Sequence, residues 1–328
     1  MNKELEIWQF AADRLKQNES VMLLVVAKSS GSSPGRQGFK MAVAEDDLYG
    51  SIGGGMMEVR LAELAKGKSK KVKGENDSEI IEQIHQKNSI NSSGMICSGK
   101  QTVIFYKLAK DDLRTVQKII QYIKNERERY LQITSNNFRV IWKKKFDVDF
   151  RFTKSESDFL YEEKLGFKHK LFIIGGGHCA LALSELMSKM DFHISLFDDR
   201  ADLNTLAKNK FVHAKKIIES YENIGEFIPS GANHFVVVMT LGYKFDEIVI
   251  RKLIEKNFKY FGVLGSRAKM ATLFKDLRKE GFDAEKLNRI RTPIGLPINS
   301  RTPEEIAVSI AAEIIAVKNA KDYFRDEG

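Results

Sequence analysis

The sequence has few cysteines, few prolines and no long apolar run. Only 2 of its 328 residues are cysteine and 5 are proline. Two cysteines cannot form a disulfide framework in a chain of this length, so the composition favours a reducing, cytoplasmic setting. No apolar run approaches the roughly 18 residues of a membrane-spanning helix, and the polar start MNKELEIWQ is unlike a secretory signal. We therefore expect a cytoplasmic protein that does not associate with a membrane.

Several catalytic signatures are also missing. The sequence has no P-loop, no HExxH motif, no CxxC pair and no Ser-His-Asp order. A hydrolase or a zinc enzyme therefore has no support. The formal charge of +9 could suggest a nucleic-acid partner, but the lysines are scattered or clustered, as at 66–73 and 143–145, without interleaved aromatics or a recognition motif. We interpret them as solvated surface and expect no nucleic acid.

What the sequence does contain supports a globular protein of two domains. Hydrophobic residues make up 43% of the chain and charged residues 30%, which allows a buried core in each of two domains of ordinary size. We place the boundary at residue 166, between a first domain at 1–166 and a second at 167–328. The predicted class is α/β, with an N-terminal α+β domain and a C-terminal Rossmann-type doubly wound parallel sheet.

Residues 170–200 carry the strongest pattern in the chain. A short apolar run at 171–174 leads directly into three glycines at 175–177. A helical segment without Pro or Gly follows, and then a second apolar run at 192–197. This order predicts a strand, a glycine turn, a helix and a second strand, which is the opening unit of a dinucleotide-binding domain.

The spacing of small and acidic residues fits the dinucleotide fingerprint. Gly175-x-Gly177-x-x-Ala180 matches the glycine pattern, and Asp198 follows at the position of an acid that takes a ribose hydroxyl. Gly175 would allow the tight turn, and Gly177 would let a pyrophosphate approach amides at a helix N-terminus. The alternative is a glycine turn that holds no ligand.

Three further side chains are candidates for the same cleft. His178 could donate to a phosphate or a ligand carbonyl, or could simply be satisfied at the turn. Arg200 offers a phosphate clamp, whereas Asp198 favours an unphosphorylated ribose. Ser266 and Arg267, after a predicted strand at 260–264, form a second possible anion seat.

The rest of the second domain continues the α/β pattern. Apolar runs predict further strands at 211–213, 235–240 and 260–264, with helices between or after them. The ends of these strands would share one edge with the glycine turn. A capping box at 302–305 begins a largely apolar helix, which must pack against the sheet or against a second copy of the chain, and this suggests a homodimer.

The first domain has a glycine-rich turn of its own. Predicted strands at 21–27, 39–44, 48–52 and 101–106 alternate with helices, and four short β-prone pieces fill 130–165. Gly53, Gly54 and Gly55 precede a helix that contains Glu58. Consecutive glycines before a helix can present amides to an anion or can be a tight turn under close packing, and both interpretations stay open.

Eight stretches together resemble the XdhC/CoxI family of accessory proteins for xanthine dehydrogenases and related molybdenum hydroxylases. They span nearly the whole chain in order: GSSPGRQGFKMAV (31–43), GSIGGGMMEVR (50–60), GMICSG (94–99), IIGGGHCALAL (173–183), DDR (198–200), VVVMTLGYKFDE (236–247), FGVLGSRAKM (261–270) and PIGLPINSRTPEEIAVSIAAEI (293–314). The sequence departs from the family where Met56 replaces a cysteine, Gly35 precedes Arg36, Ser98 replaces a glycine and Leu241 replaces a histidine.

The resemblance implies a non-catalytic insertion chaperone. Such a protein binds molybdenum cofactor, in the molybdopterin form, and passes it to an apo molybdenum hydroxylase, with a cysteine desulfurase as a further partner. Cys97 could ligate the metal or carry sulfur, since a thiolate is a soft ligand, or it could be a small buried hydrophobe. Glu58 could orient a pterin edge or could be a first-turn acid favoured by the helix dipole. Cys179 is interpreted as packing.

Two rival functions remain open. One is an NAD(P)-dependent oxidoreductase that holds a hydride donor in the Rossmann cleft and its substrate in the first domain. Against it, His178 is the sole convincing proton-transfer residue near the cleft. The other is a nucleotide-sensing regulatory module.

Overall fold

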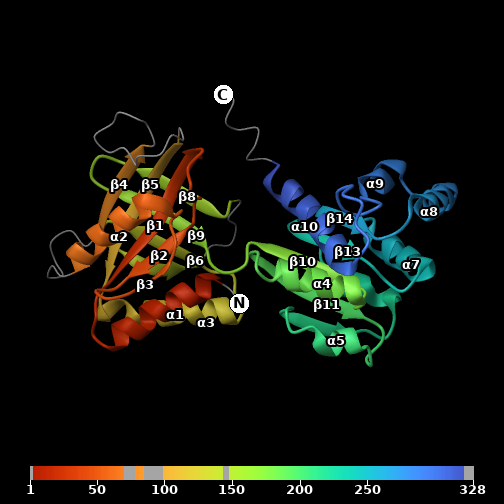
Figure 1. Cartoon of the computed structure of the whole chain (residues 1–328), viewed down its shortest axis with the longest axis horizontal. Helices are drawn as coiled ribbons and strands as arrows, with labels where there is room; N and C mark the ends of the chain where they lie inside the picture. The colour runs from red at the N-terminus through yellow and green to blue at the C-terminus, as the bar shows by residue number, and fades with distance from the viewer. Residues whose placement is uncertain (1–2, 70–77, 85–98, 143–147, 321–328) are drawn as a thin grey trace. The chain divides into compact units, whose positions relative to one another are not determined.

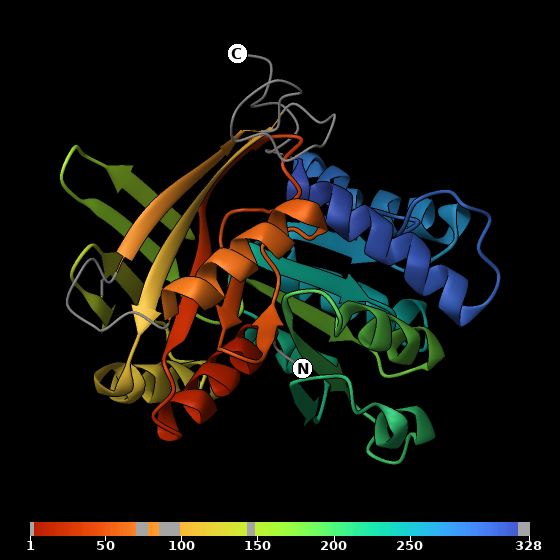
Figure 2. The ribbon, with the colours of Figure 1, turned by 60° about the vertical axis from the view of Figure 1, so that its left-hand side comes forward.

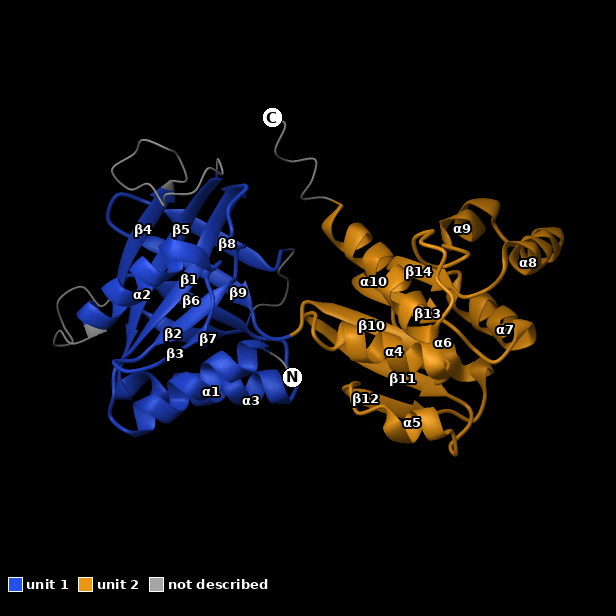
Figure 3. Ribbon diagram, viewed as in Figure 1, with its two compact units in different colours: residues 1–166 blue, residues 167–328 orange. Residues whose placement is uncertain are grey.

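The computed structural model describes residues 3–69, 78–84, 99–142 and 148–320 (Figure 1). The chain divides into two compact units, residues 1–166 and 167–328 (Figure 3). Each unit has hydrophobic clusters of its own. The loop around Cys97 and the lysine cluster at 143–145 lie outside the described residues.

The first unit contains two antiparallel sheets. The larger has the strand order β3-β2-β1-β5-β4 and the smaller has the order β7-β6-β9-β8. The strands are β1 (Val21–Gly31), β2 (Lys40–Val43), β3 (Leu48–Gly50), β4 (Ser78–Ile84), β5 (Gly99–Leu108), β6 (Tyr130–Thr134), β7 (Phe138–Ile141), β8 (Phe150–Lys154) and β9 (Phe159–Lys164). The helices are α1 (Lys3–Lys16), α2 (Gly55–Ser69) and α3 (Leu113–Lys124), with a 3₁₀ turn, η1, at Lys110–Asp112.

Alternation along β1 divides the core of this unit into two layers. Leu23 and Val25 join one cluster with α1, α3 and the smaller sheet, whereas Leu24 and Val26 join another with the inner face of α2. This is the period-2 pattern of a strand that is buried on both faces. As a result, α2 lies across one face of the larger sheet (Figure 2).

Most predicted strands of the first unit are present, including all four of the short pieces at 130–165. The strand β4 was not predicted, because its sequence SEIIEQI interrupts the isoleucines with charged and polar residues and shows neither a continuous apolar run nor a strict alternation. It is an edge strand paired to β5 alone, where polar side chains are common. The start of the lysine cluster at 66–73 is helical, since α2 continues to Ser69.

The second unit is a doubly wound parallel sheet with the strand order β12-β11-β10-β13-β14. Its strands are β10 (His169–Ile174), β11 (Phe192–Asp198), β12 (Ala214–Ile217), β13 (Gly231–Val238) and β14 (Phe258–Val263). Its helices are α4 (His178–Met187), α5 (Asn204–Lys208), α6 (Ile224–Phe227), α7 (Tyr243–Leu253), α8 (Arg267–Lys279), α9 (Ala284–Arg289) and α10 (Pro303–Asn319), with a 3₁₀ turn, η2, at Tyr221–Asn223. The predicted fold class is confirmed.

Helices cover both faces of this sheet. Leu171 and Ile173 of β10 pack in one cluster with α4 and α10, and Phe172 and Ile174 pack in another with α6, α7 and α8. The strand order reverses between β10 and β13, so the crevice at their carboxyl ends is the position where such folds bind ligands.

The prediction of a strand at 211–213 is wrong. The third strand is β12, Ala214–Ile217, and all four of its residues are exposed. Two of the four are lysines, and the strand pairs with β11 alone. An exposed edge strand of this composition has no apolar run for a sequence pattern to detect.

The apolar helix α10 packs within its own unit. It lies against α4 and the end of β14, and it buries Ala307, Ile310, Ala311 and Ile314. The predicted capping box at its start is present, with Thr302 and Glu305 bonded reciprocally. Packing inside one chain therefore accounts for its apolar face, and a homodimer remains a prediction.

No helix in the described part of the chain is long and apolar enough to cross a membrane.

Candidate functional site

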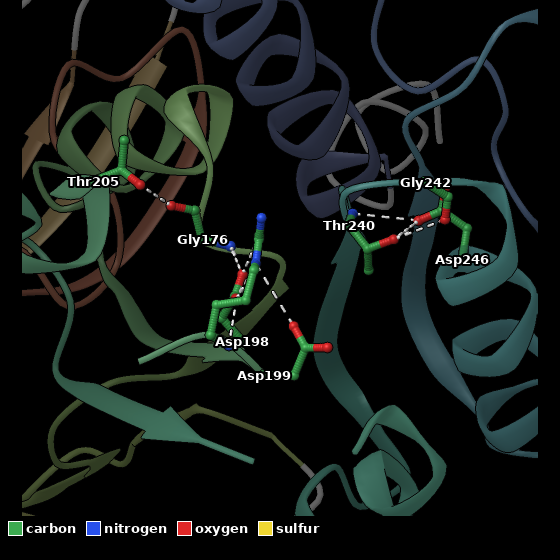
Figure 4. A network of polar contacts seen from close by, with 8 residues as sticks. Gly176, Asp198, Asp199, Thr205, Thr240, Gly242 and Asp246 are labelled. Carbon is green, nitrogen blue, oxygen red and sulfur yellow. Dashed lines mark hydrogen bonds and ion pairs between the residues drawn. The ribbon is translucent and has the colours of Figure 1, made fainter. Parts of the chain in front are cut away.

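The carboxyl edge of the parallel sheet gathers the predicted cleft residues. Because β10, β13 and β14 are neighbours and run parallel, the glycine turn after β10, Thr240 after β13 and Ser266 after β14 lie at one edge. The prediction that these strand ends share an edge is confirmed. This edge also carries the polar contacts drawn in Figure 4.

Gly175 allows the ends of β10 and β13 to approach each other closely. Its φ is +104°, and a Cβ built on it would lie 2.2 Å from the carbonyl oxygen of Met239. A side chain here would clash with backbone, which cannot move aside cheaply, and the positive φ also favours glycine. The first glycine of the fingerprint is therefore required by the fold itself.

Asp198 holds the next residue of the turn. Its Oδ2 accepts a hydrogen bond from the backbone N–H of Gly176 at 2.5 Å and another from Arg200 at 2.9 Å. Its Oδ1 accepts from the backbone N–H and the Nε of Arg200, both at 2.9 Å. The side chain of Asp198 is fully buried, whereas that of Arg200 is 28% exposed. Figure 4 shows Asp198 beside Gly176 of the turn.

These hydrogen bonds keep Asp198 ionised and leave its carboxylate unavailable to a ligand. Burial acts to raise the pKa of Asp198, but the hydrogen bonds from Arg200 and Gly176 outweigh it and leave the pKa below its ordinary value. All four acceptor positions of the carboxylate face protein donors. Asp198 therefore shapes the turn, and Asp199, whose side chain is 24% exposed, is the neighbouring acid that a ligand could reach.

The N-terminus of α4 is open to a ligand. Gly177 is its N-cap residue, and no side chain caps the first turn. A Cβ on Gly177 would meet nothing within 4 Å, and the next residue, His178, is exposed. The first-turn amides of a helix have no partner within the helix, and with the helix dipole they favour an anion. The geometry suits a phosphate group.

Sequence reasoning missed Asp246, which lies at the same edge. Its Oδ1 accepts from the Oγ1 of Thr240 at 2.6 Å and from the backbone N–H of Thr240 at 3.3 Å. Burial raises the pKa of Asp246 to about 6, even though the bonds from Thr240 and the charge of Lys269 act to lower it. The signal that could have identified Asp246 is its place as the fourth residue of α7, the helix that follows the buried strand β13.

Ser266 and Arg267 occupy the end of the neighbouring strand. Ser266 is the N-cap of α8, and its Oγ accepts from the backbone N–H of Lys269 at 3.4 Å. Arg267 begins the helix and is exposed. The hydroxyl therefore has a capping role, and the guanidinium is free to meet an anion at this edge.

The glycine turn of the first unit is held by an acid in the same manner. Oε2 of Glu58 accepts from the backbone N–H of Gly54 at 2.9 Å, from that of Ile52 at 2.8 Å and from the Oγ of Ser51 at 2.6 Å. Burial acts to raise the pKa of Glu58, but these bonds together leave it lowered. The carboxylate of Glu58 therefore already accepts the hydrogen bond from Gly54, the central amide of the turn 53–55.

A buried glutamine joins three of the motif loops in this unit. The side chain of Gln101 accepts from Ser33 Oγ at 2.9 Å and from the backbone N–H of Gly35 at 3.3 Å, and it donates to the carbonyl oxygen of Ile52 at 2.9 Å. Gly53 packs so closely on Gly35 that a Cβ would lie 2.4 Å from its nitrogen. The serine loop, the 53–55 turn and the start of β5 therefore meet at one point.

Of the two cysteines, only Cys179 lies within the described residues. Cys97 lies outside the described residues, two positions before Gly99 of β5 in the sequence. Cys179 is partly buried on α4 and packs against the core of its unit. Burial raises the pKa of the Cys179 thiol, and the charge of Glu304 raises it further, so this thiol is not activated. Within the described ranges no group of three or more His, Cys, Asp or Glu side chains could hold a metal ion.

Comparison with known families and proteins gives matches in both units. The XdhC Rossmann domain family matches residues 171–314, and the XdhC and CoxI family matches residues 14–71. The uncharacterized protein YqeB of Escherichia coli (strain K12) is 24% identical over 319 residues, which cover 96% of this chain and 47% of that protein. The chain therefore spans about half the length of this relative.

A second relative and a solved structure carry the name of one enzyme. A protein of Bacillus subtilis (strain 168), named as a probable xanthine dehydrogenase component, is 27% identical over 225 residues, which cover 65% of this chain and 64% of that protein. A crystal structure described as a xanthine dehydrogenase from Bacillus halodurans superposes with a TM-score of 0.73 at 20% identity, over 100% of this chain and 98% of that one. At this identity the structural likeness shows the shared fold.

The raised pKa of Asp246 predicts a pH-dependent stability. Because its folded-state pKa of about 6 lies above the ordinary 3.8, the folded protein holds this proton more tightly, and that stability is lost as the pH rises through 6. Asp246→Asn keeps an oxygen acceptor for Thr240 but never becomes charged. We therefore compare the free energy of unfolding of the variant with that of wild type. The difference, variant minus wild type, should increase by up to about 3 kcal/mol between pH 4 and pH 7.5.

Denaturant unfolding of both proteins at several pH values measures this shift. Asp202→Asn, which removes an exposed carboxylate of the same unit, controls for the change in net charge. A difference between Asp246→Asn and wild type that does not vary with pH would contradict the prediction.

Proposed function

The chain belongs to the XdhC and CoxI family, and from that premise we propose that it is an accessory protein for a molybdenum hydroxylase of the xanthine dehydrogenase type. It would bind molybdenum cofactor as cargo and deliver it to the apo-enzyme in the cytoplasm. The names of the Bacillus relatives support a client of this type. The observation that carries the cargo proposal is the uncapped, open N-terminus of α4.

The cargo proposal depends on a chemical feature of the cofactor. Molybdopterin carries a phosphate group, and the free amides of the first turn of α4 are suitable donors for it. Gly177 leaves room for the phosphate to approach, and the exposed His178 and Arg267 lie at the same edge of the sheet. In this arrangement Asp198 and Gly175 do not touch the cargo; they hold the turn in the shape that presents the amides.

In the first unit we assign a separate role, the handling of molybdenum or of its sulfur, to Cys97. The thiolate would ligate molybdenum or carry a sulfur atom for it, which is the chemistry that a soft ligand supplies. Glu58 and Gln101 would act as positioning residues, because their polar atoms are bonded to the loops 33–35 and 52–54. Gly54, with open space around it, is the point of the turn that a ligand could approach.

The geometry of the second unit also favours one rival. Its strand order, with the reversal between β10 and β13, is that of dinucleotide-binding domains, and Asp246 with its raised pKa adds a proton-transfer candidate. An NAD(P)-dependent oxidoreductase is therefore the second candidate function. In that case Asp199 would meet the ribose, and the acidic pair at 198–199 would disfavour a 2′-phosphate.

Titration of the purified protein with molybdopterin, with NAD(H) and with NADP(H) separates the two. We expect molybdopterin to bind, and Gly177→Ala to weaken it at least about tenfold, equivalent to about 1.4 kcal/mol, because a methyl group would block the approach to the amides. The φ of −70° at Gly177 accepts alanine without strain. Gly67→Ala, a helix glycine of the first unit with nothing within 4 Å, is the matched control. Tight binding of NADH alone, with oxidation by a substrate, would refute the accessory role.

Substitution of Cys97 tests its proposed role, and the same substitution of Cys179, the other cysteine of the chain, is the control. We expect Cys97→Ser to lose retention of the molybdenum cofactor and activation of the client, whereas Cys179→Ser keeps both, since its thiol has a raised pKa and packs in the core. The readouts are metal content after gel filtration and client activity after mixing. Equal performance of the two variants would remove Cys97 from the proposal.

A further inference from the structure

A cavity of about 690 Å³ lies in the second unit, away from the glycine turn. Two segments line it, residues 254–261, which include the amino-terminal half of β14, and residues 286–293, with Glu313 of α10. The glycine turn, in contrast, is at the carboxyl ends of the strands. None of the cleft residues discussed above lines this cavity, and its volume is within the range of small-molecule sites.

The lining of the cavity is strongly basic. It contains five cationic side chains, namely Lys256, Lys259, Lys286, Arg289 and Arg291. The two acids in the lining are already paired. Glu313 accepts from Tyr260, from Arg291 and from a backbone amide, and Glu255 pairs with Lys286.

Three of the cations could turn to a ligand. Lys259 makes no ion pair among the described residues. The side chains of Arg289 and Arg291 are 65% and 47% exposed; Arg289 pairs with the exposed Glu285, whereas Arg291 donates from one guanidinium nitrogen to the buried Glu313. An exposed ion pair such as Arg289–Glu285 contributes little to stability, so an anionic ligand could bind Arg289 at a small energetic cost. Arg291 could meet the same ligand through the N–H groups that do not donate to Glu313.

A buried hydroxyl in the lining has no partner. The Oγ1 of Thr292 is inaccessible to solvent and makes no hydrogen bond. A buried polar atom without a partner destabilises a protein, and such atoms are rare in native structures. Thr292 is next to Arg291 and lines the cavity, so rotation of its side chain about χ1 would bring the enclosed hydroxyl to a ligand oxygen that Arg291 also binds.

Three aromatic residues of β14 contribute to the lining, and two of them, Tyr260 and Phe261, are buried. Phe258, Tyr260 and Phe261 belong to the lining, and the guanidinium of Arg291 lies over the ring of Tyr260, 5.9 Å from its centroid. Arginine, lysine and hydroxyl donors together are typical of phosphate recognition.

We propose that this cavity is a second ligand site, which binds a small phosphate-bearing molecule through Lys259, Arg289, Arg291 and the hydroxyl of Thr292. It is separate from the cargo site at α4 and does not depend on the function proposed above. The phosphate could belong to a nucleotide or be inorganic, and both sources share the chemistry that the cavity recognises.

Calorimetric titration of the full chain with ADP and with inorganic pyrophosphate tests the site. Lys259→Glu should weaken binding at least tenfold, and Lys275→Glu, an equal charge reversal at an exposed position of α8, should leave it unchanged. Preference for ADP over pyrophosphate would identify a nucleotide, and the reverse would identify an inorganic source.

Thr292→Val provides the sharpest test, because valine has nearly the shape of threonine. The variant should bind ADP or pyrophosphate several-fold more weakly. At the same time, the ligand-free protein should melt about 2 °C higher, since an unpartnered buried hydroxyl has been removed. If the hydroxyl has a structural role instead, Thr292→Val would lower both the ligand affinity and the melting temperature.

Three results would overturn the proposal. The first is absence of binding of either probe, or binding that Lys259→Glu and Thr292→Val leave unchanged, which would place all phosphate binding elsewhere. The second is equal weakening by Lys259→Glu and Lys275→Glu, which would indicate attraction by net charge alone. The third is tighter binding of citrate than of pyrophosphate, which would contradict a phosphate ligand.

Discussion

The hydrogen bond from the middle amide of a glycine turn to a carboxylate of the same unit is the interaction on which both candidate sites depend. Gly54 donates to Glu58 in the first unit, and Gly176 donates to Asp198 in the second. The two units differ in fold, since one is antiparallel and the other parallel. Each nevertheless fixes its glycine turn with an internal anion, whose bonds from neighbouring donors outweigh the effect of burial and lower its pKa.

This constraint determines which amides can serve a ligand. An anion cannot bind where a carboxylate already accepts the hydrogen bonds, so a ligand of the Rossmann unit is directed to the next amides along, at the uncapped start of α4. Gly175 packs closely against the chain that follows β13, whereas no atom lies within 4 Å of the position that a Cβ on Gly177 would take. The three glycines of the turn thus have different roles: Gly175 permits close packing, Gly176 donates to Asp198, and Gly177 leaves space for a ligand.

The sequence predicted the architecture of the second unit because the central strands of its sheet are buried on both faces. Continuous apolar runs such as those of β10 and β13 are visible without a structure, whereas the edge strands β4 and β12, which contain several charged residues, have no such run. The fingerprint also located the glycine turn correctly. It could not show that Asp198 is enclosed by Arg200 and Gly176, because the fingerprint position alone does not tell whether an acid faces a ribose or its own turn.

The remaining omissions share one cause, which is that contacts between distant residues determine them. Asp246 acquires its raised pKa from burial near Thr240, and no motif marks it. Gln101 connects the loops at 33–35 and 52–54 only because strand pairing brings β5 beside β1. The basic cavity beside β14 combines residues from three separate segments, which show no common pattern along the chain.

Amide hydrogen exchange at the glycine turns, followed by NMR, tests most directly whether carboxylates hold them. The amides of Gly54 and Gly176 should exchange much more slowly than that of His178, at the open start of α4. Asp198→Ala should accelerate exchange at Gly176 by at least an order of magnitude, and Asp199→Ala should leave it unchanged. Exchange at Gly176 that is as fast as at His178 in the wild-type protein, or that is indifferent to the loss of Asp198, would contradict this picture of the site.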